Sequence, residues 1–322
     1  MESMATKEMM IGNKSAEPAG EKTCPAGQAK SLSQWKCFLL AAFGLIVCFS
    51  VPFYHLARFA WGNELYSYIL LVPFISWYLA RGKRPEQQIE SRPMRSAGVT
   101  FLTMGAAVAG WYCFLRITGE ALETEDGLAL LMLSFFFLFL GSALFTLGKN
   151  TIQTMAFPLG LMFFIIPMPV FLRDGTETFL QYGSAYAAHG MFKISGLPFM
   201  RNDLTFILPG IPQGIKVAPE CSGIHSSLIL FITSLLAGYL FLRSPWKRAI
   251  LALAVIPLGL LRNGFRVFTL GELCAHYGPQ MLDTPIHHKG GPVFFALSLI
   301  PFFALLAFLY KRERPAPKPV KN

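Results

Sequence analysis

Residues 218–242, APECSGIHSSLILFITSLLAGYLFL, join a short polar segment to a long apolar run. A transmembrane α-helix needs about 20 consecutive, mostly apolar residues, and the stretch from 223 to 242 meets that requirement. An acid, a cysteine and a histidine, Glu220, Cys221 and His225, gather where this helix would begin. The stretch therefore predicts a membrane span and directs attention to the polar residues at its start.

Apolar runs of this kind fill most of the chain. Of its 322 residues, 53% are hydrophobic and only 14% are charged, a balance that is typical of membrane proteins with several spans. The predicted spans lie at residues 36–54, 66–80, 97–117, 127–147, 152–172, 223–242, 248–269 and 291–310. We therefore predict an all-α polytopic membrane protein with about eight transmembrane helices.

The formal net charge of +10 indicates membrane orientation rather than a nucleic-acid partner, because the basic residues flank the apolar runs. Lys and Arg cluster after the second, fourth, sixth and last predicted spans. Positive residues near span ends are enriched on the cytoplasmic side, so we predict that both termini are cytoplasmic. The chain is accordingly expected to be a multi-pass protein of the cell inner (plasma) membrane.

This topology divides the chain into a membrane domain and two tails. Residues 1–35 predict a disordered cytoplasmic tail, residues 36–310 the transmembrane domain, and residues 311–322 a basic cytoplasmic tail. Within the domain, residues 173–222 are predicted to be extracytoplasmic. Mixed helical spacing, followed by β-favouring residues around Pro and Gly, predicts a small cap of one interfacial helix and a short hairpin.

The same topology brings a thiol, two guanidinium groups and an imidazole to one membrane level. Cys221 precedes the sixth span, and His287 precedes the eighth. Arg262 and Arg266 lie in the outer half of the seventh span and share a helix face, because they are four residues apart. Arginine within a span is costly, so its presence there indicates a functional site.

These residue types support acyl transfer through a thiol. A thiol becomes a strong nucleophile when an imidazole, a cation or the positive end of a helix favours its thiolate. An imidazole can protonate a leaving amine, and a guanidinium can stabilise the oxyanion formed on a carbonyl. We therefore predict Cys221 as the nucleophile, His287 as the general acid and base, and Arg266 as the stabilising cation.

Four sequence blocks resemble the exosortase/archaeosortase family of multispanning membrane transpeptidases. They are ELYSYILLVPFISWYLA (64–80), PECSGIHSS (219–227), LRNGFRV (261–267) and IHHKGGPVFF (286–295). The resemblance implies a Cys, Arg and His triad, which falls on Cys221, Arg266 and His287. Asn263 matches the Asn of the family's Asn-x-x-Arg block, and His287 lies four residues before the glycine Gly291, as in the family.

The resemblance also implies a substrate and a reaction. Such enzymes are thiol peptidases that cleave the C-terminal sorting signals of secreted proteins outside the inner membrane and transfer the product to a surface acceptor. Their substrates carry a short motif, a transmembrane helix and a basic cluster. The acceptor is left open, as lipid or polysaccharide, and the reaction requires no metal or other cofactor.

Five residues beside the triad are expected to bind substrate or support the site: Arg262, Asn263, Glu220, His225 and His288. Two positions depart from the family pattern. His225 stands where members often have arginine, and Pro292 stands where an aromatic residue is common. Both departures leave the triad intact and bear on the choice of substrate.

Two other classes of protein compete with this interpretation. A metal-dependent membrane hydrolase would use Cys274, His276, His287 and His288 as ligands, although the chain has no His-Glu-x-x-His motif. A transporter or channel would use Arg262 and Arg266 as an anion path, although no internal repeat is evident. Loss of function on replacing Cys221 would separate the transpeptidase from the transporter.

Overall fold

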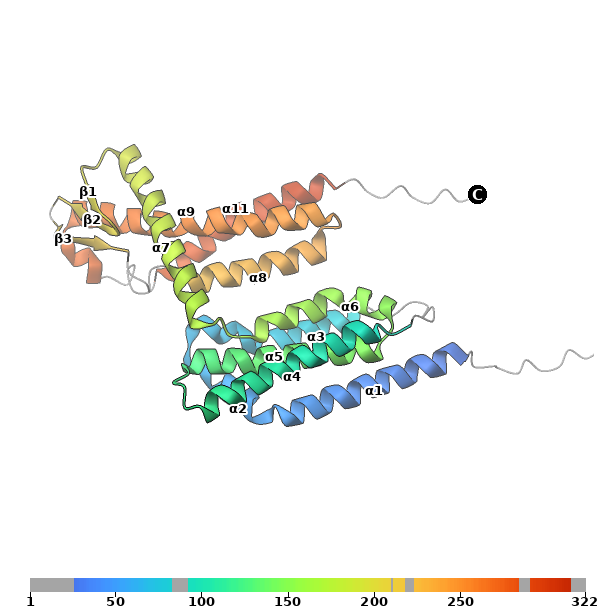
Figure 1. The fold of residues 1–322 in the computed structure, drawn as a ribbon. Helices are drawn as coiled ribbons and strands as arrows, with labels where there is room; N and C mark the ends of the chain where they lie inside the picture. Colours follow the sequence, from blue (N-terminus) through green and yellow to red (C-terminus); the bar gives the residue numbers. More distant parts are fainter. Residues whose placement is uncertain (1–25, 83–91, 210, 218–222, 284–289, 314–322) are drawn as a thin grey trace, which may run out of the picture.

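The structure is a computed structural model that describes residues 26–82, 92–209, 211–217, 223–283 and 290–313. It is a bundle of antiparallel helices with a small sheet at one end (Figure 1). The α-helices are α1 (Ala26–Cys48), α2 (Ser50–Gly62), α3 (Val72–Gly82), α4 (Arg95–Ile117), α5 (Thr124–Thr146), α6 (Lys149–Leu161), α7 (Val170–Ser195), α8 (Ile224–Phe241), α9 (Pro245–Tyr277) and α11 (Gly291–Lys311). The remaining elements are the 3-10 helices η1 (Glu64–Leu70), η2 (Met162–Ile165) and η4 (Pro279–Asp283) and the strands β1 (Met200–Asn202), β2 (Thr205–Leu208) and β3 (Ile211–Lys216).

Within the described residues, 5 helices are long and apolar enough to cross a membrane, or up to 7 if two bent helix pairs each count as one span. The five are α4, α5, α8, α9 and α11, and the bent pairs are α1–α2 and α6–α7. The predicted class, an all-α polytopic membrane protein with a small cap, is therefore confirmed. The predicted span at 66–80 forms η1 and the 11-residue α3, which is shorter than a full span.

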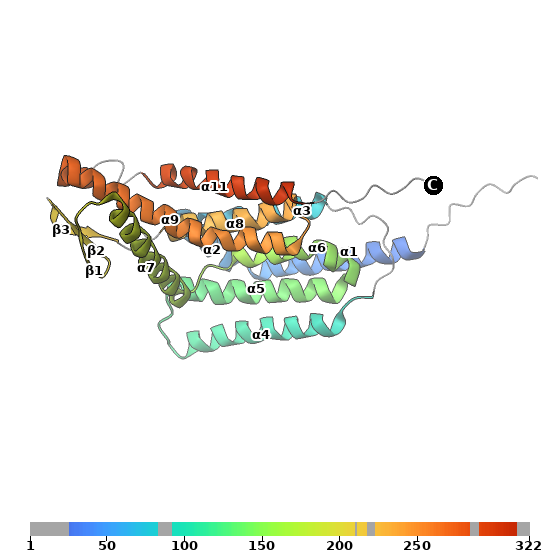
Figure 2. The same cartoon turned by 90° about the horizontal axis from the view of Figure 1, so that it is seen from above.

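Helices α4 and α5 pack through glycines that let their backbones approach closely. A Cβ atom at Gly141 of α5 would lie 2.8 Å from the backbone nitrogen of Leu102, and one at Gly105 of α4 would lie 2.7 Å from Leu138 Cγ. Small residues commonly form such contacts between membrane helices. The opposite face of α4 is open to lipid, since this helix lies at the edge of the bundle (Figure 2).

The cap combines α7 with an antiparallel sheet of order β1-β2-β3. Helix α7 runs across the end of the bundle (Figure 1), because the chain bends by 93° between Ile165 and Val170. The sheet side chains Phe206, Ile215 and Val217 share a core with residues of α7 and α9. The described part of the cap predicted at 173–222 thus contains a helix, α7, and the predicted hairpin is extended by a third strand.

Helix α7 is also tied to the N-terminal half at its first turn. The Arg173 Nη1 atom lies 2.6 Å from both carboxylate oxygens of Glu125 in α5. Beside it, the backbone N–H of Val170 donates to Asp126 Oδ1 at 2.9 Å. Tyr66 of η1 donates from its hydroxyl to Glu125 Oε2 at 3.2 Å. These contacts join three elements where the chain enters the cap.

Helix α9 is the longest element and supports the cap. Its 33 residues give a length of about 50 Å at about 1.5 Å per residue, more than the roughly 30 Å of a hydrocarbon layer. The helix is therefore longer than one crossing requires, and in its last turns Leu270 and Cys274 pack against the sheet and α7.

At the other end of the chain, α1 begins at Ala26, inside the segment 1–35 that the sequence assigns to a tail. The described ends of the chain, at the start of α1 and the end of α11, lie at the same end of the bundle, opposite the sheet (Figure 1).

Candidate active site

The predicted site lies where α8 begins, against the middle of α9. Helix α8 starts at Ile224 and is preceded by Gly223, whose φ of +70° lies in the left-handed region that glycine adopts readily. The predicted site residues Glu220 and Cys221 stand three and two positions before this glycine in the sequence and lie outside the described residues, as do His287 and His288. The structure therefore locates the elements on either side of these four residues.

Arg262 fastens the start of α8 to α9. Its guanidinium Nη2 donates to the backbone carbonyl of Gly223 at 3.2 Å and to the hydroxyl of Ser227 at 3.3 Å. The side chain is only 8% exposed, so these bonds form away from water. Its second terminal nitrogen, Nη1, is buried and has no hydrogen-bond partner among the residues that the structure describes. Arg262 thus holds the helix start that follows Cys221, and its Nη1 group can still donate a hydrogen bond.

The next two residues of α9 face a different helix. Asn263 is 3% exposed and donates from Nδ2 to the Ser184 hydroxyl of α7 at 3.1 Å. Gly264 lies against the same helix, since a Cβ atom there would be 2.6 Å from Ala187 Cβ. The sequence Arg-Asn-Gly at 262–264 therefore joins α9 to α8 on one side and to α7 on the other. This joint fixes the position of the candidate site relative to the cap.

Arg266 lies one helical turn beyond Arg262 on α9, with a partly buried side chain. Its neighbour Phe265 contacts Phe294 in the first turn of α11, with ring centroids 6.1 Å apart. The segment that carries His287 ends at this turn. The start of α11 is therefore held beside α9 at the level of Arg266.

His225 lies in the first turn of α8 and is partly buried. Its Nε2 atom has no hydrogen-bond partner within the described part of the chain. The side chain is therefore available to a group that approaches the start of α8.

Cys274 and His276, two of the four ligands of the alternative metal site, lie in different environments. Cys274 is 1% exposed and belongs to the hydrophobic core of the cap. His276 is exposed, and its Nδ1 atom lies 2.9 Å from the backbone oxygen of Glu272. The described ranges contain no group of three or more His, Cys, Asp or Glu residues with the geometry of a metal site.

Sequence reasoning missed the two serines that organise this region. Ser227 accepts a hydrogen bond from Arg262, and Ser184 accepts one from Asn263. Ser227 stands in the same block as Cys221, so its place at the helix start was a usable signal. Ser184 is far away in the sequence, and only the fold reveals its role.

These contacts define a multi-pass membrane protein in which the Arg-Asn-Gly element of α9 joins α8 and α7 beside the candidate site. The family model of the transmembrane exosortases (Exosortase_EpsH) matches residues 61–304, and the chain belongs to this family. Membership implies an exosortase-type sorting role and substrates with C-terminal sorting signals. No curated protein and no solved structure matches the chain.

Proposed function

We propose that this protein is a cysteine transpeptidase, with Cys221 as nucleophile, His287 as acid and base, and Arg266 as the cation that stabilises the oxyanion. It would cleave C-terminal sorting signals of secreted proteins at the outer side of the inner membrane and transfer them to a surface acceptor. The observation that carries the proposal is the bond from Arg262 to the Gly223 carbonyl. It holds the helix start adjacent to Cys221 against α9, one turn from Arg266.

The reaction has two halves. The Cys221 thiolate attacks the carbonyl carbon of the scissile amide, and Arg266 stabilises the negative charge that forms on the oxygen. The His287 imidazolium gives its proton to the amine as the C–N bond breaks, which leaves a thioester on the sulfur. A nucleophile on the acceptor then attacks the thioester, passes its proton to His287 and releases the thiolate. The second half therefore returns to His287 the proton that the first half transfers to the amine.

The remaining predicted residues have supporting roles in this proposal. Arg262 and Asn263 position the helix start, as their bonds to Gly223 and Ser184 suggest. His225 lies four residues after Cys221 and is proposed to tune its thiolate, and Glu220 and His288 to orient the reacting groups.

The proposed orientation places both termini in the cytoplasm and the site outside. Its support is the distribution of charge: Arg81, Arg95, Lys149 and Arg248 all lie at the bundle end opposite the sheet (Figure 1). An impermeant thiol reagent should label a cysteine at position 194 in intact cells and one at position 246 only after lysis. The native Ile194 and Trp246 are 89% and 79% exposed. The reverse labelling pattern would invert the topology.

The decisive test is Cys221→Ala, with a reporter from the same genome that ends in a motif, a transmembrane helix and a basic cluster. Processing should be lost while the amount of protein in the membrane stays unchanged. Wild-type protein should form a hydroxylamine-sensitive thioester with the reporter, detected as a mass adduct on Cys221. Full processing by the variant would refute Cys221 as the nucleophile.

A further inference from the structure

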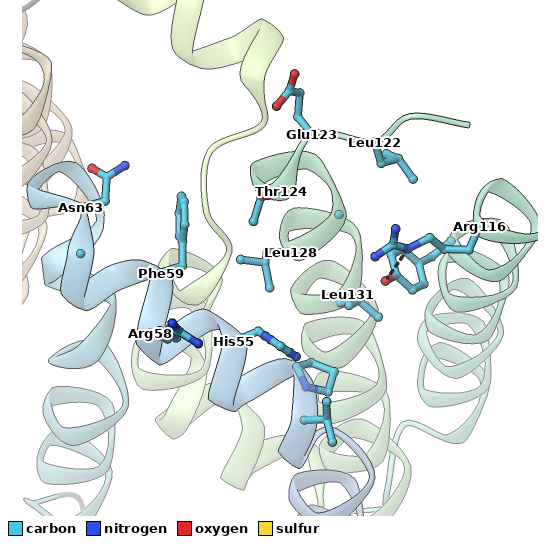
Figure 3. Close-up of a pocket in the computed structure, with 15 residues that line it drawn as sticks. His55, Arg58, Phe59, Asn63, Arg116, Leu122, Glu123, Thr124, Leu128 and Leu131 are labelled. Atoms are coloured by element: carbon cyan, nitrogen blue, oxygen red, sulfur yellow. Dashed lines mark hydrogen bonds between the residues drawn. The ribbon is translucent and has the colours of Figure 1, made fainter. Parts of the chain in front are cut away.

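A second site lies in the N-terminal half, on elements that the proposed chemistry does not use. A pocket of about 900 Å³ opens between α2, the end of α4 and the start of α5 (Figure 3). Arg58 enters it from α2 and Arg116 from α4. Between them the wall is apolar, formed in part by Phe59, Leu128 and Leu131. The pocket thus combines two cationic side chains with an apolar wall.

Both guanidinium groups retain unused donors. Arg58 makes no hydrogen bond or ion pair with any residue that the structure describes. Arg116 donates from Nε to the Tyr112 hydroxyl at 3.2 Å, and within the described ranges its two terminal nitrogens have no partner. The carboxylate of Glu123 also lines the pocket but points away from the side where Arg58 lies (Figure 3). Two arginines in one pocket therefore favour an anion from outside the chain.

The shape of the donors favours phosphate. Guanidinium groups present planar pairs of N–H donors that match two phosphate oxygens. The first turn of the 23-residue α5 adds the positive end of a helix, since Thr124 and Gly127 line the pocket. The two acidic residues of that turn, Glu125 and Asp126, are already bound to Arg173 and to the Val170 backbone.

The apolar wall favours a lipid over a soluble phosphate. The pocket lies at the end of α4 and the start of α5, two helices that are long and apolar enough to cross a membrane. The ends of such helices lie near the lipid headgroups. Val51 in its lining is 63% exposed. We infer that this pocket binds an anionic phospholipid, with Arg58 and Arg116 on the phosphate and an acyl chain along Phe59, Leu128 and Leu131.

The test compares dioctanoyl phosphatidylglycerol with dioctanoyl phosphatidylcholine, titrated into the detergent-solubilised full chain and counted as bound lipid by native mass spectrometry. Phosphatidylglycerol should bind more tightly to the wild type. The double variant Arg58→Gln with Arg116→Gln should weaken its binding by about tenfold or more, because charge-assisted bonds are lost. No preference between the two lipids would overturn the inference.

The matched control is Arg95→Gln, which removes the same charge from the opposite end of α4. It should leave the affinity for phosphatidylglycerol unchanged. A loss of affinity equal to that of the double variant would show that the lipid is attracted by the overall positive charge of the protein, and would overturn the inference. The single variants Arg58→Lys and Arg116→Lys keep the charge and guard against misfolding, and should show intermediate affinity. Glycerol 1-phosphate supplies the headgroup without chains, so displacement at equal concentration would overturn the assignment to a lipid.

Discussion

Helices α4 and α5 form an antiparallel pair, and so do α8 and α9, but the two pairs are held together by different means. In the first, glycines at 98, 105 and 141 bring the backbones into contact, with one buried hydrogen bond from Ser134 to the Gly105 carbonyl at 2.9 Å. In the second, a buried guanidinium spans the interface and binds the Gly223 carbonyl. The second pair also packs closely, since a Cβ atom at Gly259 of α9 would lie 2.9 Å from the Ser227 hydroxyl of α8. The difference is that a buried charge is added to that packing.

The difference distinguishes the contacts that hold two membrane helices together from a contact that has another purpose. Small residues and dispersion contacts suffice to join helices in lipid, as α4 and α5 demonstrate. A buried arginine costs free energy there, so the contact between α8 and α9 is not explained by assembly. Because the contact holds the helix start that follows Cys221 in the sequence, we propose that it serves the candidate site.

The largest effect is expected for Arg262→Gln. Loss of the bond to Gly223 would let the start of α8 shift, and misplacement of about 1 Å is enough to cost roughly 100-fold in rate. Processing of the reporter per folded molecule should fall by that order, mostly in kcat. Arg262→Lys should restore part of the rate. If both variants lose folded protein in proportion to activity, Arg262 is structural and the contrast between the two pairs disappears.

The opposite outcome is expected for Gly141→Leu. The larger side chain would meet the Leu102 backbone, and overpacking costs about 1–3 kcal/mol of folding free energy. The melting temperature in detergent should fall, while processing per folded molecule stays unchanged. Gly110→Leu is the control on α4, because no atom lies within 4 Å of a Cβ there. Equal losses in both variants would contradict the packing role of Gly141.

A smaller effect is expected at the joint between α9 and α7. Asn263→Ala and Ser184→Ala each remove one side of a buried 3.1 Å hydrogen bond, worth about 1 kcal/mol. The effects of the two substitutions on unfolding free energy should be less than additive in the double variant, because they remove the same bond. Strict additivity would show that the two side chains act independently.

The smallest effect concerns pH. The backbone N–H groups of Ser244 and Arg243 hold the pKa of the Glu313 carboxylate below its ordinary value. A carboxylate whose pKa is lower in the folded state than in the unfolded state stabilises the folded state at pH values above its ordinary pKa. This contribution is lost as the pH falls through the folded-state pKa. The wild type should therefore melt above Glu313→Gln at neutral pH, and the difference should vanish in acid. Glu120→Gln, an exposed carboxylate, should show no such difference.

The sequence was sufficient for the helices and for the residues of the Arg-Asn-Gly element. Most of the apolar runs form α-helix, since burial of backbone polar groups in lipid leaves little choice. The runs at 66–80 and 152–172 are broken, the first into η1 and α3 and the second by the bend between α6 and α7. The partner of each polar side chain was not predictable. Arg262 and Asn263 are adjacent in sequence, so they project in different directions from α9, and only the packed bundle shows that one meets α8 and the other α7. Likewise, the pocket of Arg58 and Arg116 joins segments about 60 residues apart.

Gly223 is restricted twice, and neither restriction involves a reactive atom. Its φ of +70° disfavours every other residue, and an added Cβ would meet the Arg262 Nη2 atom at 2.6 Å. Natural variation at this position should therefore be nearly as narrow as at a catalytic residue, although Gly223 takes part in no bond that is made or broken. The absence of a side chain at Gly223 thus leaves the space that the Arg262 guanidinium occupies.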